Sequence, residues 1–125
     1  MTINIEKVKE RLEKVKTELI ELQQTENAQI RDINNQIANH VFLINKSQGK
    51  VEELEKTFEE IGMSQTDKDD KLQTYKDIME NAQAEVQTLL QSVDNRRSSA
   101  TAEAQKLEGK REFLQELLDL SDSDN

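Results

Sequence analysis

The chain of 125 residues contains no cysteine and no proline, and only 3% of its residues are aromatic. Without cysteine it has no disulfide framework, no thiolate chemistry and no cysteine-based zinc site. Without proline, nothing breaks a helix until one of the three glycines is reached. Because only 34% of the residues are hydrophobic, a thick globular core would be hard to fill. These absences favour long helices around a thin core.

The residues and spacings that support catalysis or metal binding are also missing. His40 is the only histidine, so it cannot belong to a histidine-rich or Cys/His metal set. The acids Asp67, Asp69 and Asp70 lack the spacing of a calcium loop and fit better as carboxylates that stabilise a helix N-terminus. No glycine-rich phosphate loop, nucleophile elbow or metalloprotease motif is found. We therefore expect no enzymatic activity, no cofactor and no metal site.

The charge balance and the hydropathy pattern narrow the range of partners. Twenty-six acidic residues against seventeen basic ones give a net charge of −9, which opposes direct binding to nucleic acid. No apolar run approaches the roughly 20 residues that span a bilayer. The first residues lack the apolar core of a secretory signal. The sequence predicts a cytoplasmic or otherwise intracellular protein whose partners are proteins.

Apolar residues near the start of the chain recur at steps of three and four, the spacing that lines one face of a coiled-coil helix. We call this line of positions the seam. It begins at Ile5, Val8, Leu12, Val15, Leu19 and Leu22. It continues, with two additional four-residue steps, through Glu26, Ile30, Ile33, Ile37, Val41 and Ile44, and then through Ser47 or Gln48 to Val51, Leu54, Phe58 and Ile61. The pattern predicts a helix over about residues 3–61.

The signals that end this helix and start another lie close together. Gly62 can adopt the left-handed conformation that closes a helix C-terminus. Ser64 with Asp67 has the spacing of a capping box, and Thr66 with Asp69 offers the same signal two residues later. A connection this short makes the two helices antiparallel neighbours. The sequence therefore predicts a turn at residues 62–64.

A second seam follows the turn. Its positions are Leu72, Tyr75, Met79, Ala82, Val86, Leu89, Val93, Arg97, Ala100, Ala104, Leu107, Arg111, Leu114 and Leu118. It predicts a helix over about 65–120, followed by an acidic tail at 121–125 in which Ser121 and Ser123 are candidate phosphorylation sites. In a chain folded at residue 63, seam partners have numbers that sum to 126, as Leu12 and Leu114 do. We expect an all-α fold: two long helices in an antiparallel coiled-coil hairpin, with residues 1–125 as a single domain.

Polar residues and glycines interrupt this regular pattern. Arg97 is predicted within the seam, where its stem can pack while its charged head reaches water. Arg96 and Arg97 are candidate partners for Glu26 or solvent-exposed bases. Gly49 and Gly109 fall within the predicted helices, either at a close approach or as tolerated weak points on a solvated face.

Two groups of apolar residues widen the seam and are candidate partner-binding sites. The first, the apolar quartet, consists of Val41, Phe42, Leu43 and Ile44. The second, the C-terminal apolar cluster, consists of Phe113, Leu114, Leu117, Leu118 and Leu120. In the hairpin register, Leu114 and Leu118 face the first helix, so simple closure of the hairpin is an alternative role for the second group. We expect the hairpins to associate into a higher-order helical bundle, as a homo-oligomer.

These features predict a non-catalytic structural or scaffolding protein that acts through self-association and protein–protein contacts. The alternative is an adaptor or assembly chaperone that binds a client through its C-terminal amphipathic helix. An acidic inhibitor that mimics nucleic acid is a weaker alternative, because bases are interspersed with acids along both helices.

Overall fold

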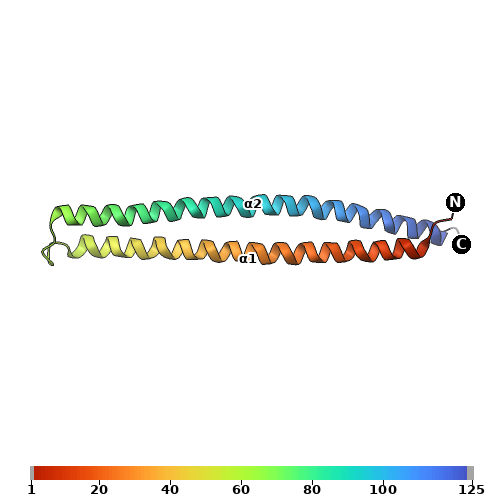
Figure 1. Ribbon diagram of the computed structural model, residues 1–125, viewed down its shortest axis with the longest axis horizontal. Helices are drawn as coiled ribbons and strands as arrows, with labels where there is room; N and C mark the ends of the chain where they lie inside the picture. Colours follow the sequence, from red (N-terminus) through yellow and green to blue (C-terminus); the bar gives the residue numbers. More distant parts are fainter. Residues whose placement is uncertain (1, 124–125) are drawn as a thin grey trace. The chain divides into compact units, whose positions relative to one another are not determined.

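The computed structural model describes residues 2–123, and almost all of them are helical (Figure 1). Helix α1 spans Ile5–Thr57 and helix α2 spans Gln65–Ser123. The described residues contain no strand. This confirms the predicted all-α fold of two long helices.

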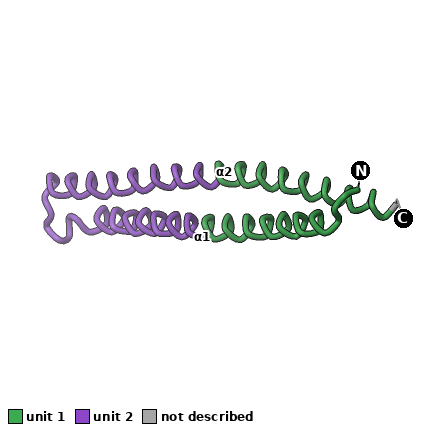
Figure 2. The backbone as a smooth tube through the Cα atoms, turned by 45° about the vertical axis from the view of Figure 1, so that its right-hand side comes forward, with its two compact units in different colours: residues 1–30, 94–125 green, residues 31–93 purple. Residues whose placement is uncertain are grey.

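The helices contribute to two compact units, which Figure 2 shows in different colours. Unit 1 pairs the chain up to residue 30 with the chain from residue 94, and unit 2 consists of residues 31–93. In each unit a segment of α1 lies antiparallel to a segment of α2. Unit 2 also contains the turn between the helices, so it forms a helical hairpin.

Asn4 begins α1 as its N-terminal cap. The backbone amide of Lys7 donates a hydrogen bond to Asn4 Oδ1 at 3.2 Å, and the amide of Val8 donates to the Asn4 carbonyl oxygen at 3.1 Å. A side-chain oxygen at this position satisfies one of the amides that a helix start leaves unpaired. This cap was not predicted, although an Asn just before the first seam residue is a typical signal for one.

Gly62 closes α1 in the way that its sequence position predicts. Its φ angle is 74°, in the left-handed region that residues with a Cβ rarely adopt. The Gly62 amide donates to the carbonyl of Glu59 at 3.2 Å, and the Met63 amide donates to the carbonyl of Phe58 at 2.9 Å. These two bonds form the Schellman motif, which satisfies carbonyls at the end of a helix.

The regular part of α1 ends at Thr57, four residues before the predicted end near residue 61. One more turn follows, in which the Ile61 amide donates to the Thr57 carbonyl at 3.1 Å. The prediction counted this turn as helix. In the structure, carbonyls of this turn accept the hydrogen bonds of the capping motif, because the left-handed Gly62 bends the chain away from the helix axis.

Ser64 begins α2, which confirms the first of the two capping frames. The Asp67 amide donates to Ser64 Oγ at 3.1 Å, and the Lys68 amide donates to the Ser64 carbonyl at 3.0 Å. Thr66, the cap of the other frame, lies inside the helix. Lys68 Nζ also lies 3.7 Å from the centroid of the Phe58 ring, a cation–π contact across the turn.

Helix α2 extends to Ser123, three residues beyond its predicted end near 120. Neither glycine nor proline follows Leu120, so no residue stops the helix there. The predicted acidic tail is therefore helical through Ser123, and its last two residues, 124 and 125, lie outside the described part of the chain.

Residues of the predicted seam form the core of unit 1. The buried cluster consists of Val8, Leu12, Val15, Leu107 and Leu114. Half-buried residues that pack against it are Ile3, Leu19, Leu22, Leu117 and Leu118. Val15 is 0% exposed, the most completely buried of these side chains. The core is one side chain wide on each helix, as the limited apolar content of the sequence requires.

In unit 2 two predicted seam residues, Val41 and Ile61, are exposed, and His40 is half-buried in place of Val41. Of the two predicted bridging positions, Ser47 is buried and Gln48 is exposed. The predictions of Val41 and Ile61 as seam residues are therefore wrong. Alternating steps of three and four, counted from the seam residue Ile37, reach His40, Ile44 and Ser47, because helix periodicity rather than side-chain polarity decides which residues face the partner helix.

The two glycines within the helices lie in open surroundings. Gly49 and Gly109 are both exposed, and a Cβ atom built on either would meet no atom within 4 Å. A close approach of another element therefore does not explain them. They fit the alternative prediction, tolerated weak points on a solvated face.

Candidate interaction surfaces

A polar cluster lies in the seam of unit 1. Arg96 Nη1 lies 3.4 Å from Glu26 Oε1 and also donates a hydrogen bond to Gln29 Oε1. The side chain of Glu26 is only 19% exposed, and its second oxygen, Oε2, is buried without a hydrogen bond from the described residues. Of the two alternatives predicted for Arg96, partner of Glu26 or solvent-exposed base, the structure shows the first.

Arg96, and not Arg97, occupies the seam at this level. Arg97 is exposed, so its prediction as a seam residue is wrong. The contacts of Arg96 explain its position, because its guanidinium bonds to the Glu26 carboxylate and to the Gln29 side-chain oxygen on α1. The other seam arginine, Arg111, is half-buried as predicted and bonds to Glu108 on its own helix at 2.7 Å.

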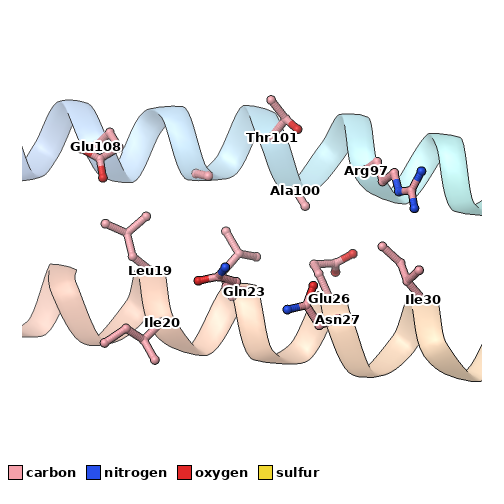
Figure 3. A pocket seen from close by; sticks show the side chains of 12 residues that line it. Leu19, Ile20, Gln23, Glu26, Asn27, Ile30, Arg97, Ala100, Thr101 and Glu108 are labelled. Carbon is pink, nitrogen blue, oxygen red and sulfur yellow. The ribbon is translucent and has the colours of Figure 1, made fainter.

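Next to the polar cluster, unit 1 has an open groove of about 670 Å³ (Figure 3). Its α1 side is lined by Leu19, Ile20, Leu22, Gln23, Glu26, Asn27 and Ile30, and its α2 side by Arg97, Ala100, Thr101, Ala104 and Glu108. Figure 3 shows Leu19 and Ile30 pointing from α1 toward α2, where Ala100 presents only a methyl group. The groove exists because small residues occupy seam positions of α2.

The C-terminal apolar cluster divides into two parts. Leu114 belongs to the buried core of unit 1, and Leu117 and Leu118 pack against that core. Phe113 and Leu120 are exposed, at 57% and 56%. The first three residues therefore have the role that the alternative prediction gave them, closure of the helix pair, and only the other two lie on the surface.

The apolar quartet lies in unit 2 and is largely on the surface. Phe42 is 64% exposed, and Val41 and Leu43 are also exposed. Ile44 is half-buried in the seam. Lys46 Nζ lies 6.0 Å from the centroid of the Phe42 ring, at the outer limit of a cation–π contact. Three members of the quartet are thus accessible to a partner.

The quartet lies within a part of unit 2 that has almost no charge. Residues 33–45 of α1 contain no Asp, Glu, Lys or Arg, and residues 81–93 of α2 contain only Glu85. The two segments lie side by side in unit 2 (Figure 1). Leu90, on the α2 segment, is also exposed. We call the two segments the neutral band. Its absence of charge is visible in the sequence, but only the fold pairs the two segments.

Among residues 2–123, no group of three or more His, Asp or Glu side chains is arranged to hold a metal ion. His40 is half-buried in unit 2. No helix within the described residues is long and apolar enough to cross a membrane.

Comparison with known proteins gives no match to a family model, to a curated protein or to a solved structure. The class of the protein therefore rests on its own fold: a pair of long antiparallel helices with a heptad-spaced core. Its candidate functional features are therefore the surfaces described above: the groove of unit 1, the neutral band, and the exposed residues Phe113 and Leu120.

Proposed function

We propose that the protein is a non-catalytic structural or scaffolding protein that associates with a second copy of itself through the neutral band. The observation that carries this proposal is the coincidence of exposed apolar side chains with the least charged part of the chain. Val41, Phe42, Leu43 and Leu90 are exposed in a region with a single ionisable acid, Glu85.

Electrostatics favours this part of the surface for contact between copies. Each chain carries a net charge of −9, so two copies repel one another wherever their acidic surfaces meet. Burying charged side chains in an interface also requires their desolvation, which costs free energy unless each charge finds a partner. Contact through the neutral band keeps both costs small, because Glu85 is its one Asp, Glu, Lys or Arg residue. The asparagine and glutamine side chains there can pair across the interface without either penalty.

The apolar side chains of the band supply the attraction. Complete burial of a large apolar side chain contributes about 1.5 to 3 kcal/mol relative to leaving it in water. In a two-fold dimer each copy contributes the same patch, so each residue of the band that lies in the interface acts twice. Two helix pairs packed in this way form a four-helix segment, the arrangement expected for helices with an apolar stripe wider than one seam.

Sedimentation velocity of the wild-type chain and of Phe42→Glu tests this proposal. We expect the wild-type chain to form a dimer or larger oligomer and Phe42→Glu to shift it toward the monomer, because the new carboxylate would be buried in the interface. Ile61→Glu is the matched control, since Ile61 is also 64% exposed but lies at the turn, outside the band. A monomeric wild type, or equal effects of the two substitutions, would overturn the proposal.

The exposure of Phe113 and Leu120 favours a second candidate, an adaptor that binds a client through the C-terminal part of α2. Deletion of this segment is not a clean test, because Leu114, Leu117 and Leu118 contribute to the core of unit 1. Phe113→Ser avoids that problem. It should leave both the helix content and the oligomeric state unchanged while removing client binding.

A further inference from the structure

The groove of unit 1 is separate from the neutral band and is not used by the proposed self-association. We infer that it is a docking site for a basic amphipathic helix of another protein. The inference rests on the shape and apolar lining of the groove and on the distribution of charge along α2 next to it.

The groove leaves apolar side chains partly uncovered. Ala100 and Ala104 occupy positions of the α2 seam where Leu107 and Leu114 are buried further along the helix. Because alanine is too short to cover the opposite helix, Leu19, Leu22 and Ile30 remain half-buried. Ile20, which also lines the groove, is 56% exposed. An apolar helix face laid on these residues would remove them from water.

The length of the groove fits a short helix. From Arg97 to Glu108 the α2 lining spans eleven residue steps. At about 1.5 Å per step this is roughly 16 Å, or three helical turns. A partner helix of that length presents apolar anchors at positions i, i+3 or i+4 and i+7, which is the usual form of helix-in-groove recognition.

The charges at the Glu108 end of the groove favour a basic partner. Within the groove, Glu26 is paired with Arg96 and Glu108 is paired with Arg111, and the exposed Arg97 lines the opposite end. At the Glu108 end, a second shallow depression follows on α2, lined by Arg111, Glu112, Gln115, Glu116 and Asp119. Its one base, Arg111, is already engaged by Glu108, which leaves three carboxylates facing solvent. Lysine or arginine side chains on the partner helix would complement them.

A second copy of this chain is a poorer occupant. It would bring its own net charge of −9 to the acidic Glu108 end of the groove. Its stretch at residues 7–16 is basic, with five bases and two acids, but the apolar residues of that stretch, Val8, Leu12 and Val15, are buried in the core of unit 1. That segment therefore cannot offer an apolar face to a groove.

Three synthetic helical peptides test the inference on the full chain. The first combines a leucine face with lysines, the second has glutamate in place of lysine, and the third keeps the lysines but has serine in place of leucine. Fluorescence anisotropy at about 0.15 M salt, where exposed charges are screened beyond roughly 8 Å, measures their binding. We expect only the first peptide to bind. Equal binding of the first and third peptides would mean non-specific charge attraction and would overturn the inference.

Substitutions then locate the binding site. Ile20→Asn removes an apolar contact and Ala104→Leu fills the groove, and we expect each to weaken binding roughly tenfold, equivalent to about 1.4 kcal/mol. Phe113→Asn is the matched control, because Phe113 is 57% exposed but does not line the groove. Circular dichroism confirms that each variant remains helical. Binding that is insensitive to both groove variants would contradict the inference.

A final comparison separates this site from the neutral band. The first peptide should bind the Phe42→Glu variant as tightly as the wild-type chain, since Phe42 lies in unit 2 and the groove in unit 1. Loss of binding in that variant would contradict an independent site. If Ile20→Asn abolished self-association, a second copy would be the occupant of the groove and the inference would be wrong. Failure of the self-association proposal would leave the peptide assay unaffected.

Discussion

The pairing of Glu26 with Arg96 shows how one polar residue in an apolar seam constrains its neighbours. Glu26 is largely removed from water, and a carboxylate in that position requires a compensating charge or hydrogen bonds. Arg96 provides both, because its long stem packs along the helix while its guanidinium reaches Glu26 and Gln29. Removing both charges from water costs free energy that offsets much of their attraction. Such a pair therefore adds little net stability, and its main effect is to fix which residues of the two helices face each other.

Replacing Arg96 alone should therefore be more harmful than replacing the pair. We expect Arg96→Met to lower the free energy of unfolding by about 1 to 2 kcal/mol, because it leaves the Glu26 carboxylate without its partner. The double variant Glu26→Leu with Arg96→Met should recover most or all of that loss. Urea unfolding followed by circular dichroism at neutral pH measures both. Arg97→Met is the control, and a loss of stability as large as that of Arg96→Met would contradict this account.

At the scale of the helices, local capping signals decide where each element begins and ends. Asn4 and Ser64 supply side-chain oxygens to the first free amides of α1 and α2, and Gly62 supplies the left-handed residue that ends α1. All three are short-range interactions, encoded within four residues of sequence. This is why the turn was predictable to within a few residues before the structure was known.

The glycines should respond in opposite directions to the same substitution. Gly62→Ala should destabilise the protein by about 1 kcal/mol, because alanine is strained at a φ of 74°. Gly49→Ala should stabilise it by about 0.5 to 1 kcal/mol, since a Cβ there meets no other atom and alanine favours the helix. The midpoints of thermal unfolding measure both effects. A fall in the midpoint for Gly49→Ala would indicate a close contact at that position.

The bounds of the two helices were predicted more accurately than the residues of each helix that face its partner. The heptad pattern identified almost every core residue of both units, because periodicity alone determines which side of a helix is apolar. It failed at Val41 and Arg97, where the steps depart from strict alternation, and at Ile61, which lies beyond the end of α1 and is exposed. At such a stutter the sequence allows either of two adjacent residues to occupy the seam. In the structure Arg96 and His40 occupy it, and Arg96 is held there by its contacts with α1.

At the scale of the whole molecule, charge and apolar exposure are unevenly distributed. Unit 1 has the continuous buried cluster, and its surface includes the acidic stretch of α2 from Glu108 to Asp119. Unit 2 contains the neutral band, with exposed Phe42 and Leu90. The two units are therefore expected to interact with different partners: another copy for unit 2, and a basic helix for unit 1.

Self-association through the neutral band should be visible in hydrogen exchange. Binding that favours the folded state suppresses local opening, so amide exchange slows where the partner is bound. As protein concentration rises, we expect slower deuterium uptake in peptides covering residues 33–45 and 81–93. Peptides covering Val8 to Val15, in the core of unit 1, are the internal control and should not change. A concentration dependence that is equal in both sets would contradict an interface confined to the band.

The sequence by itself determined the helical class, the position of the turn and most of the core, because caps and heptad spacing act over a few residues. It also contained the charge-free run at residues 33–45. Only the tertiary structure decided which surfaces remain accessible. Antiparallel pairing places Leu114, Leu117 and Leu118 in a core while leaving Phe113 and Leu120 outside, and it sets the small residues Ala100 and Ala104 opposite Leu19 and Ile30 to open a groove. Such surfaces depend on residues far apart in the chain, and no local pattern encodes them.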